Sequence, residues 1–252
     1  MEQINLALTT WLDNFFRQWP QDIEWSEEAK KPLNIDASQL TEFFSLLAEP
    51  LFAVQHPSLQ FNPWEIAGLQ RKEVPNTSVL AWLLNPYASH GFGKLPLQVL
   101  LRLIRSKNRH DIPADFNRFC HIETETNPVG DDTNRVDIEI SADNFFLLIE
   151  VKIDAGEQDQ QIARYCIDAK IRAANRPWAV IFLTPQGRRP LTGNPELTLE
   201  SVPCLSWRQL AADLESSLLL YHNQCIATGN ISPMQDMASY AVFCFLEHIR
   251  TF

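Results

Sequence analysis

The sequence is short of basic residues. It has 21 Lys and Arg residues against 31 Asp and Glu residues, which gives a formal net charge of −10 at pH 7. An acidic chain repels polyanions, so this balance argues against a protein that binds nucleic acid through its overall charge. Any contact with nucleic acid must therefore use a local basic patch, a metal ion or a partner subunit.

Long apolar runs and paired cysteines are also missing. The apolar runs are far shorter than a membrane span, and the N-terminus lacks the basic region and apolar core of a signal peptide. The five cysteines are odd in number, widely spaced and without a CxxC motif, which favours buried free thiols over disulfides or zinc. We therefore expect a cytoplasmic protein that makes no membrane contact.

Two common catalytic signatures are absent as well. The sequence contains no glycine-rich phosphate-binding loop, and no nucleophile elbow supports Ser/His/Asp chemistry. Its scattered histidines His121, His222 and His248 do not have the spacing of metal ligands, so we expect them to be structural. The chemistry, if there is any, must come from carboxylates and lysine.

The chain is expected to divide near residue 63. Residues 1–63 are predicted to form a helical extension that packs on the core or on a partner, and residues 64–252 a larger domain with C-terminal helices. A short helix is predicted over 39–48. Another helix is predicted over 1–19, where apolar and aromatic side chains recur at helical spacing. This helix is the candidate contact for a protein partner or a second copy, through Leu8, Trp11, Leu12, Phe15, Phe16 and Trp19.

Two apolar helices are expected before the sheet. Residues 65–71 can be helical, and Pro75 is expected to interrupt that pattern. The polar residues 76–78 then offer caps for a helix that ends at Asn85-Pro86. A second helix is expected over 95–106, with basic residues at its C-terminal end, where they suit the helix dipole.

Candidate nucleic-acid contacts lie in and after these helices. Arg102, Arg105 and Lys107 belong to the most basic segment of the chain, which is read either as a phosphate contact or as a solvated helix end. His90, in the loop between the helices, is read either as a nucleic-acid contact or as the donor of a loop-fixing hydrogen bond. Arg135, at the start of a predicted strand, completes the candidate set.

The rest of the chain predicts an α/β fold with a mixed central sheet flanked by helices. A strand, a helix and another strand follow one another in the middle, which is a crossover that favours a parallel pair. Ser206 with Gln209, and Ser232 with Gln235, have the spacing of helix capping boxes. The expected strands are 119–126, 135–141, 145–153, 178–184 and 202–206, and the expected helices 157–174, 207–220 and 233–250.

The stretch that carries the chemistry runs from Asp137 to Lys152. Glu150 and Lys152 share one face of a very apolar strand, where a carboxylate and an ammonium are costly unless they are paired. If the strands expected over 135–141 and 145–153 pair as a hairpin, Asp137 converges with Glu150, and the Val151 carbonyl lies beside them. These oxygens suit Mg²⁺, and Lys152 is placed to position or activate a water molecule.

The order of motifs resembles a known family. Arg-Val-Asp-Ile at 135–138, Ile-Glu-Val-Lys at 149–152 and Gln-Ile-Ala-Arg-Tyr at 161–165 resemble the PD-(D/E)XK nuclease superfamily. EVPNTSVLAWLLNP at 73–86 and HGFG at 90–93 are similar to a bacterial branch of that superfamily, as are FLTPQGRRP at 182–190 and LSW at 205–207. The Pro-Asp pair that names the superfamily is Val136-Asp137 here.

This resemblance implies a restriction-endonuclease-like core that uses Mg²⁺ or Mn²⁺ to hydrolyse the phosphodiester bonds of DNA. It implies Asp137 and Glu150 as metal ligands and Lys152 as the catalytic lysine, with Gln161 and Tyr165 supporting them from the next helix. A place in bacterial defence against phage comes with the same branch.

The resemblance also adds acids to the metal site. Glu73 matches the glutamate of the N-terminal helix in that branch, and Glu123 matches the acid of its first strand. The resemblance implies that each binds metal directly or through water. Glu125 and Glu139 are rival acids on the neighbouring strands, so the choice between Glu123 and Glu125 stays open.

Two other functions compete with the nuclease. The acidic charge and the aromatic N-terminal helix also fit a catalytically inactive nuclease-fold subunit or inhibitor. A sugar- or nucleotide-acting α/β enzyme has no support beyond the fold class.

Overall fold

The structure is a computed structural model that describes residues 36–54, 61–126, 136–158, 160–191 and 202–252. The chain divides into two compact units, Met1–Gln60 and Phe61–Phe252. The described part of the first unit is helix α2, Ala37–Val54, which is longer than the predicted 39–48. The helix predicted over 1–19 lies outside the described residues. The role of the extension, on the core or on a partner, stays a prediction.

A mixed five-stranded sheet forms the centre of the second unit, in the order β1-β2-β3-β4-β5. The pairs β1–β2 and β2–β3 are antiparallel, and the pairs β3–β4 and β4–β5 are parallel. The α/β fold with its parallel crossover is confirmed, and it agrees with a restriction-endonuclease-like core. The strands are β1 (Cys120–Thr126), β2 (Val136–Ala142), β3 (Phe146–Val151), β4 (Trp178–Thr184) and β5 (Cys204–Ser206).

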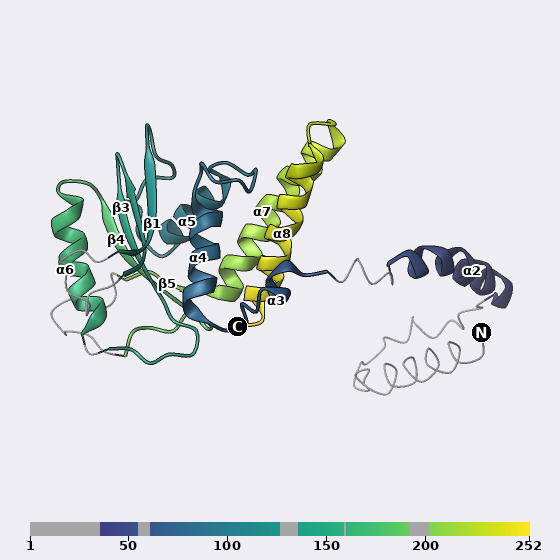
Figure 1. Ribbon diagram of the computed structural model, residues 1–252, viewed down its shortest axis with the longest axis horizontal. Helices are drawn as coiled ribbons and strands as arrows, with labels where there is room; N and C mark the ends of the chain where they lie inside the picture. Colours follow the sequence, from purple (N-terminus) through teal and green to yellow (C-terminus); the bar gives the residue numbers. More distant parts are fainter. Residues whose placement is uncertain (1–35, 55–60, 127–135, 159, 192–201) are drawn as a thin grey trace, which may run out of the picture. The chain divides into compact units, whose positions relative to one another are not determined.

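Helices cover both faces of this sheet (Figure 1). Helix α6, Gln161–Ala173, lies on one face, where Phe146 and Leu148 of β3 pack beneath it. The other face carries four helices, and Leu147 and Ile149 of β3 join their core. Because β3 is buried on both sides, its sequence is an unbroken apolar run up to Glu150. The four helices are α4 (Glu73–Leu84), α5 (Leu95–Ser106), α7 (Trp207–Ala227) and α8 (Pro233–Arg250), preceded by the short α3 (Pro63–Ile66).

The predicted start of α4 was wrong. The helix begins at Glu73, before the expected caps, and Pro75 lies inside its first turn. Proline is tolerated there because a first-turn N–H has no partner within the helix. Asn76 does not cap the helix: it is buried, and its Nδ2 donates to the carbonyls of Gln70 (2.9 Å) and Lys72 (2.8 Å). This shift places the Glu73 carboxylate at the helix N-terminus.

The later helix starts agree better with the sequence. The Ser206 hydroxyl accepts from the Gln209 amide at 3.0 Å, and Ser232 with Gln235 forms a complete capping box. Helix α6 begins at Gln161, later than predicted, because Gln160 adopts a left-handed conformation with φ of 52°. No helix in the described ranges combines the length and apolar character needed to cross a membrane.

The capping box at α8 predicts a local stability effect. Ser232→Ala removes the acceptor for the Gln235 amide and should lower the free energy of unfolding by about 1 kcal/mol, measured by urea denaturation. Ser216→Ala, an exposed site within α7, is the matched control. A Ser232→Ala loss no larger than that of the control would contradict the prediction.

Candidate active site

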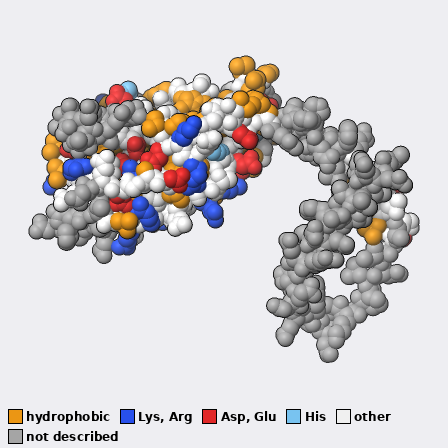
Figure 2. Space-filling model, turned by 60° about the horizontal axis from the view of Figure 1, so that its bottom comes forward, with side chains coloured by type: hydrophobic (Ala, Val, Ile, Leu, Met, Phe, Trp, Pro, Cys, Tyr) orange, Lys and Arg blue, Asp and Glu red, His pale blue; other side chains and the backbone are white. Residues whose placement is uncertain are grey.

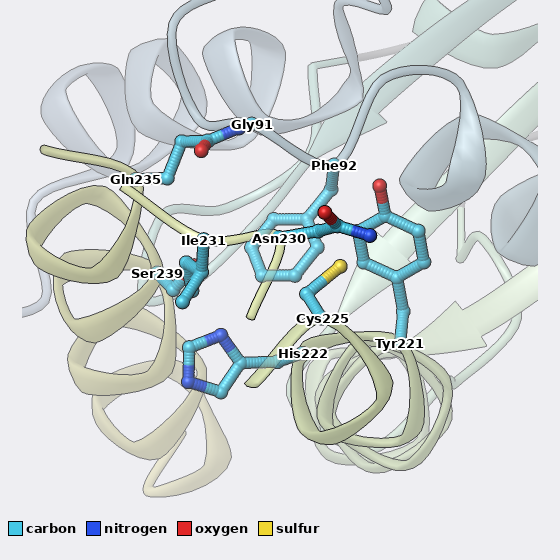
Figure 3. Close-up of a pocket in the computed structure, with 9 residues that line it drawn as sticks. All are labelled: Gly91, Phe92, Tyr221, His222, Cys225, Asn230, Ile231, Gln235 and Ser239. Atoms are coloured by element: carbon cyan, nitrogen blue, oxygen red, sulfur yellow. The ribbon is translucent and has the colours of Figure 1, made fainter. Parts of the chain in front are cut away.

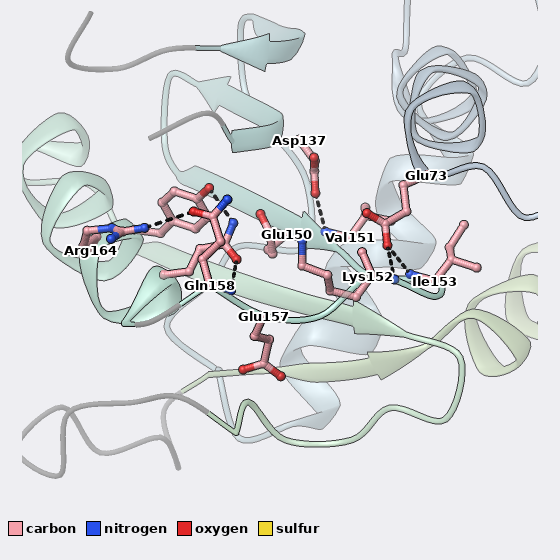
Figure 4. Close-up of polar contacts among 12 residues, drawn as sticks. Glu73, Asp137, Glu150, Val151, Lys152, Ile153, Glu157, Gln158 and Arg164 are labelled. Atoms are coloured by element: carbon pink, nitrogen blue, oxygen red, sulfur yellow. Dashed lines mark hydrogen bonds and ion pairs between the residues drawn. The ribbon is translucent and has the colours of Figure 1, made fainter. Parts of the chain in front are cut away.

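The candidate site lies where β3 reaches its carboxyl end (Figure 4). Strand β2 runs antiparallel to β3 and pairs Ile138 with Ile149, so continuing the register puts Asp137 opposite Glu150. The Glu150 side chain is 1% exposed and Lys152 is 12% exposed. The hairpin predicted from the sequence therefore brings the two acids and the lysine together.

Short polar contacts hold this group. The Val151 amide donates to Oδ2 of Asp137 at 2.7 Å, and Nζ of Lys152 lies 2.7 Å from Oε1 of Glu150. The other Glu150 oxygen, Oε2, is buried and accepts from no N–H or hydroxyl donor of the described residues, although the Asp137 and Glu150 carboxyl groups lie within hydrogen-bonding contact of each other. A buried carboxylate oxygen without a donor is costly, and it marks a place where a cation would be favoured.

Burial dominates the protonation of these residues. It raises the pKa of Glu150 to about 8, and the charge of Asp137 adds to the rise. Burial also raises the pKa of Asp137 to about 6, although the Val151 amide and Lys152 oppose it. For Lys152, burial works against the ammonium, but the Glu150 carboxylate outweighs it and the pKa of Lys152 is raised. Lys152 is therefore a cation between two acids that hold protons unusually well.

The donor set fits a hard divalent cation. Asp137 and Glu150 supply carboxylate oxygens, and one of them is the buried Oε2 of Glu150. The N–H and C=O of one strand residue point to the same neighbouring strand, so the Val151 carbonyl lies on the Asp137 side. No group of three or more His, Cys, Asp or Glu side chains suited to a metal occurs in the part of the chain that the structure describes. Mg²⁺ often uses only one or two protein carboxylates, so two acids and a carbonyl are enough.

Glu73 acts on the loop that follows β3. Its Oε1 accepts from the backbone amides of Ile153 (2.8 Å) and Ala155 (3.2 Å). Its charge also helps to raise the pKa of Asp137, so the carboxylate lies within electrostatic reach of the site. The sequence located Glu73 at the site but gave no sign of this backbone contact. Its role as a metal ligand stays a prediction.

Glu123 lies further from the group. It is exposed on β1, pairs with His121 at 2.7 Å, and is opposite Glu139 in the sheet register. Interpolating that register puts position 125, rather than 123, opposite Asp137. The Glu125 side chain lies outside the described residues, so the choice between the two acids rests on this backbone register.

Gln161 and Tyr165 close the α6 side of the site. Nε2 of Gln161 donates to the Tyr165 hydroxyl at 3.0 Å, and Oε1 of Gln161 accepts from the Gln158 amide at 3.4 Å. Tyr165 is fully buried, and burial together with the Glu150 charge raises the pKa of its hydroxyl. The pair therefore links the loop before α6 to the buried end of β3.

Comparison with family models decides the identity of this fold. The model of the PD-(D/E)XK nuclease superfamily matches residues 61–228, about two thirds of the chain. The chain belongs to the PD-(D/E)XK nuclease superfamily. Searches of curated proteins and of solved structures each found no match. The sheet, the acids on β2 and β3 and the lysine after them are all inside the matched region.

His90 does not fit the role of a nucleic-acid contact in this superfamily member. It is buried, its Nε2 donates to the Asn85 carbonyl at 2.9 Å, and its Nδ1 accepts from the Phe92 amide at 3.1 Å. Burial also lowers the pKa of His90. Both ring nitrogens are thus used to shape the loop, which is the alternative role that the sequence left open.

The other basic candidates are not brought to the acids. Arg102 donates to the Ser217 hydroxyl of α7 at 3.0 Å, and Arg105 donates to backbone carbonyls just after α5. Both belong to the helix layer on the sheet face opposite α6. Lys107 lines a separate cavity of about 320 Å³ at the β5 edge. Arg135 lies outside the described residues. A nucleic-acid role for these residues stays a prediction.

The sequence missed two ion pairs in the loops around the site. Arg71 pairs with Asp154, and Arg188 pairs with Glu157, whose side chain is 3% exposed. Glu157 also accepts from the Leu191 amide at 2.8 Å. Residues 154–160 have the ordinary composition of a polar loop, so no spacing distinguishes these acids before the fold is known.

A small pocket elsewhere is no rival site. It lies between α7, α8 and the turn at Gly91 and Phe92, and its volume is about 30 Å³ (Figure 3). Such a space holds a few water molecules at most. His222 lines it, and none of the acids of the superfamily motif does.

The raised pKa of Glu150 predicts how stability depends on pH without metal. Folding raises the pKa of this acid from 4.5 to about 8, so the associated stability is present below 4.5 and is lost as pH rises through 8. In wild type the free energy of unfolding should therefore decrease as pH rises, and Glu150→Gln should remove roughly 2–4 kcal/mol of that decrease. Urea denaturation in EDTA measures both. Glu123→Gln, at an exposed acid, is the control. Parallel pH profiles for wild type and Glu150→Gln would contradict the prediction.

Proposed function

We propose that this superfamily member is a deoxyribonuclease that hydrolyses phosphodiester bonds with Mg²⁺ or Mn²⁺. The observation that carries the proposal is the convergence of Asp137, Glu150 and Lys152 at the end of β3. Three chemistry-bearing side chains rarely gather at a buried strand end without a function, because their desolvation is costly.

The cation would be held by Asp137, Glu150 and the carbonyl of Val151. When bound, it would supply Lewis-acid stabilisation of charge on the phosphate and make water more acidic. The buried Oε2 of Glu150 supports this assignment, since a cation would give this oxygen the partner that it lacks. Glu73 and one of the β1 acids are candidates to complete the set.

Lys152 is proposed to act as an ammonium. Its pKa is raised by the facing Glu150, so it donates hydrogen bonds and does not accept a proton from water. At this position it orients the attacking water and stabilises the negative charge that develops on the phosphoryl oxygens. Gln161 and Tyr165 keep the end of β3 in place from the α6 side.

The setting of this activity follows from the resemblance. We place the protein in the bacterial cytoplasm, acting on DNA in defence against phage. The competing proposal is a nuclease-fold subunit without catalysis, and one observation favours it. In the first unit, helix α2 exposes more than half of Phe43, Phe44 and Leu46, which suits contact with a protein.

Cleavage assays test the catalytic residues. Glu150→Ala and Lys152→Ala should each lower the rate of DNA cleavage in Mg²⁺ or Mn²⁺ by at least about 100-fold. Plasmid and linear substrates would be compared on gels, with Glu247→Ala, at an exposed α8 position, as the control variant. Cleavage that survives both substitutions would refute the site. A folded wild type that binds no divalent ion and cuts no DNA would favour the non-catalytic subunit.

Metal binding should depend on pH. A cation competes with the protons that Asp137 holds up to about 6 and Glu150 up to about 8. The rise in melting temperature on adding Mg²⁺ or Mn²⁺ should therefore be larger at pH 8 than at pH 6. Differential scanning fluorimetry measures this rise, with Glu150→Gln as the comparison. An equal rise at both pH values, or one that Glu150→Gln leaves unchanged, would contradict the prediction.

A further inference from the structure

A cleft opens beside the candidate site, at the carboxyl ends of β3 and β4. Its volume is about 310 Å³. Ile153, the residue after Lys152, lines the cleft, so the cleft adjoins the candidate catalytic group. None of the basic residues named as nucleic-acid contacts from the sequence lines the cleft. The lining residues are Arg71, Ile153, Thr184, Pro185, Gln186, Arg188 and Phe252.

Arg71 is held from two sides. Its Nε and Nη2 donate to the Asp154 carboxylate at 2.9 and 2.7 Å, and its guanidinium lies 5.1 Å from the centre of the Phe252 ring. The third nitrogen, Nη1, has no partner among the described residues. The side chain is 43% exposed, so this edge of the guanidinium is available to a ligand.

Arg188 is held in a similar way. Its Nη1 donates to Glu157, and its guanidinium lies 5.4 Å from the centre of the Phe182 ring. Its backbone amide donates to the Thr184 hydroxyl at 3.0 Å. Nε and Nη2 have no partner in the part of the chain that the structure describes. Gly187, at φ of 68°, lets this turn approach Ser206, where a Cβ atom would lie 3.1 Å from the Ser206 amide.

Two fixed guanidinium groups suit one class of ligand. Guanidinium donors match the oxygens of a phosphate, and a side chain already held in place loses little entropy on binding. The chain carries a net charge of −10, and the face that Figure 2 shows mixes acids and bases, so the field of the whole protein does not attract a polyanion. Recognition in this cleft must therefore come from the placement of individual donors.

We propose that this Arg71–Arg188 cleft binds the phosphodiester backbone of the substrate strand next to the cleaved phosphate. The proposal rests on the proposed nuclease function. Arg71 is the more accessible phosphate ligand, and Arg188 supports the same strand from the β4 side. Asp154 and Glu157 orient the two guanidinium groups and at the same time keep the empty cleft close to neutral.

The pair of Arg71 and Asp154 allows a sharp test. Arg71→Gln should weaken binding of a labelled oligonucleotide of about 20 nucleotides by about fivefold or more, and should lower the slope of log K against log salt by about one. Asp154→Asn removes a negative charge from the cleft but keeps one side-chain oxygen that can accept from the Arg71 guanidinium, so it should leave binding unchanged or tighten it. If Arg71 mattered only through its ion pair, both variants would weaken binding equally. Fluorescence anisotropy in Ca²⁺, with single-stranded and duplex probes, measures both.

Controls separate this effect from folding and from net charge. Arg118→Gln, at an exposed position just before β1 and at the sheet edge where β3 begins, makes the same charge change away from the cleft and should have little effect. Arg188 is tested as Arg188→Lys, because its removal would leave the buried Glu157 without its cation and could unfold the chain. Melting temperatures of all variants are compared with wild type.

The results divide cleanly. Selective weakening by Arg71→Gln supports the cleft, even if the wild type cuts no DNA and the nuclease proposal fails. Equal weakening by Arg71→Gln and Arg118→Gln, or by Arg71→Gln and Asp154→Asn, overturns it. So does the absence of wild-type binding to either probe at about 100 μM, while Glu150-dependent cleavage would still support the nuclease.

Discussion

The burial of Glu150 at the end of β3 is the constraint on which the site depends. A carboxylate there loses its hydration. One of its oxygens pairs with the Lys152 ammonium, and the other accepts from no donor of the described residues. Removing one member of a buried ion pair typically costs about 3–5 kcal/mol. Glu150 can avoid part of that cost by taking up a proton, since its pKa is already raised to about 8. The arrangement is poor for stability and well suited to receiving a cation.

The fold supplies this arrangement from both of its helix layers. Helix α6 covers the Glu150 face of β3 and contributes Gln161 and Tyr165. Helix α4 comes from the other face, and its first residue, Glu73, holds the backbone after β3. The acids therefore lie at the carboxyl end of β3, where α6 covers the strand and α4 contacts the loop that follows it.

Local patterns were sufficient for the elements and for the central pair. The apolar run of β3, the turn before it and the crossover after it predict that Asp137 and Glu150 converge, and the structure has them in register. The start of α4 was not predictable, because Pro75 is compatible with a first turn as well as with a break. The sequence left Glu139 as a rival acid for the metal site, yet in the fold it is buried and pairs with Arg172 of α6. Such pairings depend on how distant elements dock, which no spacing in the sequence records.

The charges around the site set an electrostatic condition for the binding of a polyanion by this acidic chain. With their protons removed, Asp137, Glu150 and Glu73 outnumber Lys152, so the site by itself repels a phosphodiester. The arginines of the adjoining cleft do not change this balance, because each is matched by a carboxylate. In the proposed nuclease, favourable binding of the cleaved phosphate would therefore require a divalent cation between the acids. Under that proposal, substrate binding would be coupled to the cation, and the cleft arginines would determine where the flanking phosphates lie.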